Sequence, residues 1–257
     1  MITGAANGIG TALARRYARA GHAVAVLDVD VDAADVVAKD LAASGSEAIA
    51  LGCDVTRAKD CHETIRHVVD KWGRVDLLIN NAGITHVGLV AETQTDVFRR
   101  VMDVNFFGAV NCTQAALPHL LESRGRVVVM SSVAGFAPLA TRAGYAASKH
   151  ALMGFFGSLR AEHEEDGLGV TLVCPSFVRT GIGSRALAAT GDRAISDART
   201  GVRNPMEPEV VAEGIFRGER RGRRVIFVGR EARLAWWAWK LVPGVYETLM
   251  RRRLVGA

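Results

Sequence analysis

Tyr145 and Lys149 carry the most specific chemical signal in this chain of 257 residues. Oxidising an alcohol by hydride loss needs a base for the hydroxyl proton, and the reverse reaction needs an acid. Tyrosine has an ordinary pKa of about 10, too high for a base at neutral pH. Residues four apart share one helix face, so we expect the Lys149 ammonium to stabilise the phenolate and lower the pKa of Tyr145.

Ser132 stands thirteen residues before Tyr145, directly after an apolar run. A hydroxyl there can hydrogen-bond a substrate oxygen as charge develops on it. Asn105 falls within a helical pattern. Taken singly, each residue also has a structural reading: a loop cap for Ser132, half-buried packing for Tyr145 and an ordinary helix position for Asn105. Together, in this order, they favour hydride-transfer chemistry.

A glycine-rich turn opens the chain with the spacing Gly-x-x-x-Gly-x-Gly. Glycines let the backbone turn tightly and approach a pyrophosphate, whose charge then meets the positive end of a helix. An ordinary loop would explain the glycines alone, but a place directly before a helical pattern favours a dinucleotide. The expected cofactor contacts here are Gly4, Asn7, Gly8, Ile9 and Gly10. Only two residues precede the turn, whereas a strand needs about five, so we expect the native protein to carry several more residues upstream.

Asp28 ends a predicted strand at Ala23–Leu27, 18 residues after the glycine turn. A carboxylate there can accept hydrogen bonds from both hydroxyls of the adenosine ribose and would repel a 2′-phosphate. The residue that follows, Val29, is not basic. The alternative is a surface aspartate at a strand end. We predict NAD, with NADP the less favoured cofactor, and place Asp54 and Val55 beside the adenine.

Short apolar runs alternate with helical patterns along the chain, which predicts parallel strands joined by crossover helices. The expected fold is α/β: a single doubly wound (Rossmann) domain over residues 1–229 with a mostly parallel seven-stranded sheet and helices on both faces. Residues 230–257 form a C-terminal amphipathic helical extension. The other predicted strands are Ala48–Cys53, Leu77–Ile79, Val127–Met130, Gly169–Val173 and Val225–Val228, and the helices include Thr95–Leu121 and Ala143–Asp166.

An Asn-Asn-Ala-Gly motif at residues 80–83 completes a pattern that resembles the short-chain dehydrogenase/reductase family over residues 3–229. The resemblance implies that Lys149 also holds the nicotinamide ribose and that Asn105 binds a water linking Lys149 to solvent. It further implies cofactor contacts from the following positions: Asn81, Ala82, Gly83, Tyr145, Lys149, Pro175, Val178 and Thr180. Val178 and Thr180 would hold the carboxamide, although Ser176 replaces the family's usual glycine in this segment.

The expected substrate wall is mostly apolar, with His86, Val133 and Ile182 as candidate contacts. His86 has two readings, a donor in the pocket or a surface histidine. Three arginines are the exceptions that would suit a carboxylate: Arg142, Arg179 and Arg185. The segment Thr180–Pro208 is irregular and is interpreted as a lid. A neutral or lipophilic secondary alcohol or ketone is therefore the favoured substrate.

The C-terminal extension carries Trp236, Trp237 and Trp239 beside basic residues. Tryptophans in such a helix can lie at a membrane interface, cover the substrate pocket or pack against a subunit, and protein packing is the safer reading. The extension resembles that of hydroxysteroid dehydrogenases within the family. Family members commonly pair through two long helices, which implies at least a homodimer.

The remaining composition restricts the class of protein. The formal charge of +5 comes from arginine clusters at residues 217–224 and 251–253, which are interpreted as solvated surface rather than a nucleic-acid site. Four cysteines without a CxxC pair predict free, buried thiols and no metal site. We expect a cytoplasmic oxidoreductase, peripheral at the membrane at most. The alternative is a catalytically silent NAD-binding or membrane-associated scaffold of the same fold.

Overall fold

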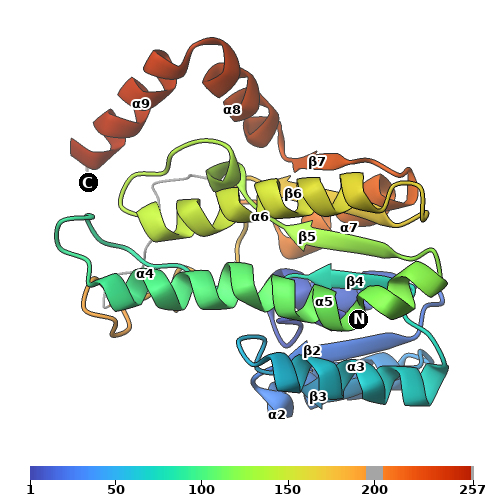
Figure 1. Ribbon diagram of the computed structural model, residues 1–257. Coiled ribbons are helices and arrows are strands. Elements are labelled where there is room, and N and C mark those ends of the chain that lie inside the picture. Colours follow the sequence, from blue (N-terminus) through green and yellow to red (C-terminus); the bar gives the residue numbers. More distant parts are fainter. Residues whose placement is uncertain (195–204, 256–257) are drawn as a thin grey trace.

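The computed structural model describes residues 1–194 and 205–255 (Figure 1). The strands are β1 (Ile2–Thr3), β2 (Val24–Asp28), β3 (Ala48–Gly52), β4 (Leu77–Asn80), β5 (Arg126–Met130), β6 (Gly169–Pro175) and β7 (Val225–Val228). The α-helices are α1 (Gly8–Ala18), α2 (Val31–Ala43), α3 (Ala58–Trp72), α4 (Thr95–Met102), α5 (Gly108–Glu122), α6 (Ala143–Glu162), α7 (Pro208–Arg220), α8 (Arg230–Leu241) and α9 (Pro243–Val255). The predicted strands are confirmed to within two residues at each end.

The described strands form one parallel sheet in the order β3-β2-β1-β4-β5-β6-β7. The chain moves outward from β1 to β3, returns to the other side of β1 and then moves outward from β4 to β7. Sheets of this kind bind ligands outside the carboxyl ends of the strands, at the point where the order reverses. The predicted doubly wound fold is confirmed, and the order reverses between β1 and β4, so the crevice expected of this topology is at the carboxyl ends of these two strands.

The first strand has the expected central position. Ile2 pairs with Val26 of β2 on one side and with Ile79 of β4 on the other. The amino group of Met1 donates to the carbonyl of Leu77 at 2.8 Å. A hollow next to it is lined by Met1, Val24 and Leu77, among others, at the amino ends of the neighbouring strands. This hollow is at the amino ends of the strands, opposite to the carboxyl ends where the topology places a ligand site.

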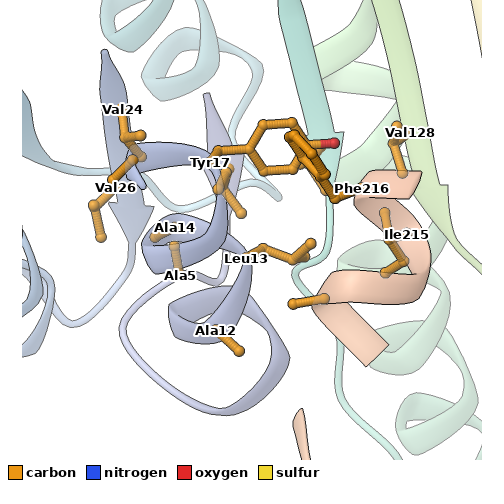
Figure 2. Packing of buried hydrophobic residues seen from close by; sticks show 14 of the residues in the cluster. Ala5, Ala12, Leu13, Ala14, Tyr17, Val24, Val26, Val128, Ile215 and Phe216 are labelled. Atoms are coloured by element: carbon orange, nitrogen blue, oxygen red, sulfur yellow. The ribbon is translucent and has the colours of Figure 1, made fainter. Parts of the chain in front are cut away.

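Each face of the sheet packs against its own layer of helices. Helices α1, α2 and α7 bury their apolar residues with one face, and α3, α5 and α6 with the other. Figure 2 shows the first layer, where the ring of Tyr17 from α1 meets that of Phe216 from α7. Their centroids are 5.1 Å apart in an edge-to-face arrangement. Small residues such as Ala12 and Ala14 let α1 approach the sheet closely, which fixes the start of this helix at the crevice.

The predicted long helix Thr95–Leu121 is interrupted. A π-helical segment, Asp103–Phe107, lies between α4 and α5. Such segments insert one residue into the helix and occur often at functional sites. Asn105 lies in this segment and is buried.

The C-terminal helices α8 and α9 continue beyond β7 at one end of the molecule (Figure 1). Trp236 packs against Phe136 at 5.0 Å between ring centroids, and Trp239 packs against Tyr246 at 5.8 Å. Trp237 is 55% exposed. Of the three tryptophans for which the sequence favours packing over membrane contact, Trp236 and Trp239 therefore pack within the protein. Among the described residues no helix combines the length and apolarity that crossing a membrane would require.

Candidate active site

The glycine turn runs from β1 into α1 at the crevice. Gly4 has a φ of 61° and Gly8 a φ of 57°, a region that favours glycine. A Cβ on Gly4 would lie 2.8 Å from the Cα of Ala82, and one on Gly10 would lie 2.2 Å from the carbonyl oxygen of Gly4. Both contacts are too short for any other residue. The turn is thus a cradle of bare backbone at a helix N-terminus, which suits a pyrophosphate.

A hydrogen-bond network ties this turn to the segment after β4. The hydroxyl of Thr3 accepts from the backbone N–H groups of Asn81 and Ala82, both at 3.0 Å. The amide of Asn81 donates to the carbonyls of Thr3 and Gly4, both at 2.9 Å. The loops after β1 and β4, the second of which carries the predicted cofactor contacts Asn81 and Ala82, therefore hold each other in place.

Asp28 lies at the end of β2 and is turned toward the glycine turn. One carboxylate oxygen accepts from the N–H of Ala6 at 3.0 Å, and the other accepts from the N–H of Asp30 at 3.1 Å. Each oxygen keeps a further lone pair for a ligand hydroxyl. After β3, Val55 is buried, and the carboxylate of Asp54 accepts from the hydroxyl of Thr56 at 2.7 Å.

Lys149 lies in α6, with its ammonium directed into the protein. The Nζ atom donates to the carbonyl of Met130, the last residue of β5, at 2.7 Å. Burial lowers the pKa of Lys149 to about 8. The neighbouring loop is anchored to the same helix, because the Ser131 hydroxyl donates to the carbonyl of Lys149 at 3.2 Å. This contact places Ser132 beside α6, where its hydroxyl accepts from the N–H of Ala134.

Tyr145 lies one turn before Lys149, and the Nζ atom is 5.6 Å from the centroid of the tyrosine ring. Burial raises the pKa of Tyr145, and a hydrogen bond with Ser132 and the charge of Arg142 oppose this only in part. The expectation that Lys149 lowers the pKa of Tyr145 is therefore wrong for this structure. The physical reason is that desolvation of the phenol outweighs the charges and hydrogen bonds nearby.

Asn105 connects the π-helical segment to both sides of the site. Its carbonyl oxygen accepts from the N–H of Ile84 at 2.8 Å, and its amide donates to the carbonyl of Ile84 and to the hydroxyl of Ser148. A Cβ on Gly83 would lie 3.2 Å from Asn105 Oδ1 and 3.6 Å from Lys149 Nζ. The sequence-predicted residues Gly83, Asn105 and Lys149 therefore meet at one point.

His86 is neither the pocket donor nor the surface histidine that the sequence suggested. It is fully buried, and so is neither a surface residue nor open to the crevice. Its Nε2 atom accepts from the N–H of Gly144 at 2.9 Å, at the start of α6 and next to Tyr145. Its ring meets that of Phe98 edge to face at 5.4 Å. His86 thus caps helix α6, which carries Tyr145. This role depends on a partner, Gly144, that is distant in the sequence and is recognised only in the structure.

The segment after β6 folds back over the glycine turn. A Cβ on Gly8 would lie 3.3 Å from the methyl group of Thr180, so Thr180, which is predicted to hold the carboxamide, lies beside the glycine turn. The guanidinium of Arg185 donates to the side chain of Asn7 at 2.5 Å. The sequence had offered Arg185 only as a contact for a substrate carboxylate, and no local pattern links it to a residue so far away in the chain.

Other predicted positions are placed less centrally. Pro175 is the last residue of β6 and is buried, and Val178 pairs with Met206 through an isolated bridge. Ile182 is half-buried, and Val133 packs into the cluster of Phe136 and the C-terminal helices. Of the predicted lid, Thr180–Pro208, residues 195–204 lie outside the described residues.

Fold and site together define a dinucleotide-dependent oxidoreductase. Residues 1–190 match the family model of the short chain dehydrogenases. The chain is 35% identical to 11-beta-hydroxysteroid dehydrogenase A of Sesamum indicum, over 98% of this chain and 74% of that protein. It is 34% identical to dehydrogenase/reductase SDR family member 7B of Bos taurus, over 98% of this chain and 80% of that protein.

A solved structure of a short chain dehydrogenase/reductase from Burkholderia phymatum, in complex with NAD, superposes with a TM-score of 0.82. It is 26% identical, and the match covers 93% of each chain. The chain belongs to the short-chain dehydrogenase/reductase family and is a dehydrogenase/reductase enzyme of that family.

Proposed function

We propose that this enzyme transfers a hydride between NAD(H) and a secondary alcohol or ketone, with Tyr145 as the general acid and base. The observation that carries the proposal is the convergence of Tyr145, Ser132 and Lys149 beside Gly83, at the carboxyl ends of β4 and β5. The glycine cradle and the inward-turned Asp28 fit a dinucleotide next to these residues.

A bound nicotinamide supplies or accepts the hydride and, when oxidised, adds a positive charge to the site. In the reducing direction Tyr145 donates its proton to the carbonyl oxygen, which a phenol with a raised pKa can do because it stays protonated at neutral pH. Ser132 donates a hydrogen bond to the same oxygen. Lys149 would hold the nicotinamide ribose, and Asn105 would hold a water through which a proton returns from solvent.

The choice of NAD over NADP rests on Asp28. Its carboxylate is buried and held by two backbone N–H groups, so it cannot swing away from a 2′-phosphate. Arg185 adds a positive charge at the glycine turn, where the pyrophosphate would lie. Asp54 and Val55 form the adenine side of the site, and Val178 and Thr180 the carboxamide side.

The substrate that we propose is neutral or lipophilic, steroid-like or long-chain. The partners of the nearby arginines within the protein support this substrate class. Arg142 is buried and donates to the hydroxyl of Thr85 at 2.9 Å. Arg179 pairs with Glu207 at 3.0 Å, and Arg185 donates to Asn7. Each of these three guanidinium groups is therefore engaged by a partner within the protein. The similarity to a protein named as a hydroxysteroid dehydrogenase agrees with this substrate class.

A homodimer and a cytoplasmic location, peripheral at the membrane at most, complete the proposal. In the π-helical segment before α5, Phe106 meets Phe107 and, across to α6, Phe155 in edge-to-face contacts. Phe107 is 49% exposed, which suits a subunit contact. Any membrane contact of α8 would use Trp237, Leu234 and Leu241, since all three are exposed.

The proposal is tested by NADH absorbance with a panel of hydroxysteroids, secondary alcohols and long-chain ketones. We expect turnover on at least one of them. In Tyr145→Phe, which keeps the ring but lacks the proton, turnover should fall by about 100-fold or more while NADH affinity stays within about twofold. Tight NADH binding without turnover on any substrate would instead favour the silent scaffold.

A further inference from the structure

Three cysteines that are scattered in the sequence meet inside the protein. Cys53 follows β3, Cys61 lies in α3 and Cys112 lies in α5. All three are buried, and their sulfur atoms all lie within 4.8 Å of one another. The sulfurs of Cys61 and Cys112 are 3.4 Å apart. The fourth cysteine, Cys174, lies elsewhere, in the cluster of Phe136 and Tyr246.

The thiol cluster lies in a mainly apolar part of the core. Its cysteines belong to the same hydrophobic cluster as Ile65 and Ala109, and the hydroxyl of Thr64 is within hydrogen-bond reach of Cys53. Hydrogen bonds with Cys53 and Cys61, together with burial, raise the pKa of Cys112 well above its ordinary value. The pKa of Cys61 is also raised, by its hydrogen bond with Cys53 and by burial, whereas hydrogen bonds from Cys112 and Cys61 lower the pKa of Cys53. Cys61 and Cys112 therefore resist ionisation, and thiols in general are suitable ligands for soft centres.

The mainly apolar surroundings of the three cysteines favour a bound ion whose charge the thiolates neutralise. A monovalent or divalent cation bound by three thiolates would leave a net negative charge in an apolar core, which is costly. A trivalent centre bound by three thiolates carries no net charge. It also takes only three ligands, the number that the cluster offers.

We propose that Cys53, Cys61 and Cys112 form a binding site for trivalent arsenic, taken up as arsenous acid. In this reaction three As–S bonds form and three As–OH bonds break. Each thiol proton leaves with a hydroxyl group as water, so three waters are released and no atom is oxidised or reduced. The product is a neutral As(S-Cys) centre with three sulfur ligands, linking the end of β3 to α3 and α5.

The site has a direct connection to the adenine side of the crevice. The thiol of Cys61 donates to the carbonyl of Val55 at 3.7 Å, and the amide of Asn111 donates to the same oxygen at 2.9 Å. Arsenic would remove the Cys61 donor and leave that of Asn111. The proposal itself does not depend on the proposed function, because its test measures neither cofactor nor turnover.

The test is the intact mass of the folded, full-length chain, reduced with a phosphine and mixed with arsenite. We expect one arsenic per chain with the loss of three hydrogens, the signature of three As–S bonds. A two-thiol adduct would retain a hydroxyl group and weigh correspondingly more. That result, or no adduct with arsenite in tenfold excess, would overturn the proposal.

Variants locate the site. Cys112→Ala and, as a second choice should it fold poorly, Cys53→Ala should lose the three-bond adduct, whereas Cys174→Ala should keep it. A ligand that prefers the folded state raises the thermal midpoint, so arsenite should raise the midpoint of the wild type and of Cys174→Ala but not of Cys112→Ala. An equal three-bond adduct in Cys112→Ala, or a lowered midpoint in the wild type, would contradict the assignment.

Discussion

Replacing Asp28 by alanine should change the cofactor preference of the enzyme. The side chain would offer two ribose hydroxyls a charged acceptor, and a hydrogen bond to a charged group contributes about 1.5–3 kcal/mol. In the variant, water can replace part of these two hydrogen bonds, so we expect NAD to lose about 1.5–3 kcal/mol of binding free energy for the two bonds together. At about 1.4 kcal/mol per tenfold change, the Kd for NAD should rise by about 10- to 150-fold.

The same substitution should strengthen NADP binding. Because the Asp28 carboxylate is only 8% exposed, solvent screens its repulsion of a 2′-phosphate incompletely. We expect the Kd for NADP to fall by about tenfold. The folded state should lose little stability: the N–H groups of Ala6 and Asp30 lose an acceptor, but the first is half-buried and the second exposed, so water can take its place.

Both affinities can be measured without a substrate, by calorimetry or by quenching of protein fluorescence. Asp32→Ala is the matched control, because Asp32 is exposed in the first turn of α2 and its removal changes the net charge equally. A wild type that binds NADP as tightly as NAD would refute the reasoning. So would a shift in Asp32→Ala as large as that in Asp28→Ala.

Three further outcomes follow from the structure. His86→Leu leaves the N–H of Gly144 without its acceptor and should lower kcat by about 10- to 100-fold through misplacement of Tyr145. His86→Gln can still accept from this N–H and should keep most of the wild-type kcat. An equal loss of kcat in both variants would argue that His86 does not act by capping α6. Burial lowers the pKa of Lys149 to about 8, so above pH 8 the unfolded chain binds up to one proton more than the folded protein. The free energy of unfolding of the wild type should therefore rise relative to that of Lys149→Met between pH 8 and about 9.5 in denaturant titrations. Parallel curves of unfolding free energy against pH for the two proteins would count against a buried ammonium. If the proposed dimer forms through the face around Phe107, Phe107→Arg should convert it into monomers in light scattering at micromolar concentration. A wild type that is already monomeric would rule out this interface.

The parts of the site that the sequence predicted well are those set by local geometry. Because their segment forms an α-helix, a spacing of four residues places Tyr145 and Lys149 on one helix face. The glycine turn is recognisable because only glycine fits where the backbone approaches Ala82 and Gly4. Asp28 is placed by the strand that it ends, and parallel strands bring their carboxyl ends to one edge of the sheet.

The misread residues depend on partners far away in the chain. His86 accepts from an N–H 58 residues later, and Arg185 reaches a side chain 178 residues earlier. The helix around Asn105 was predicted as regular, since periodicity does not reveal an inserted residue that forms a π-helical turn. The direction of the Tyr145 pKa was missed because desolvation depends on how deeply the fold buries the phenol.

The sequence by itself determined the alternation of strand and helix, the glycine turn and the order of the proposed catalytic residues, because each depends on residue types and their spacing along the chain. The tertiary structure alone decided which protons are held tightly, that His86 caps α6 and which three thiols meet. Those properties depend on desolvation and on contacts between distant segments, and both arise only when the helices close over the sheet.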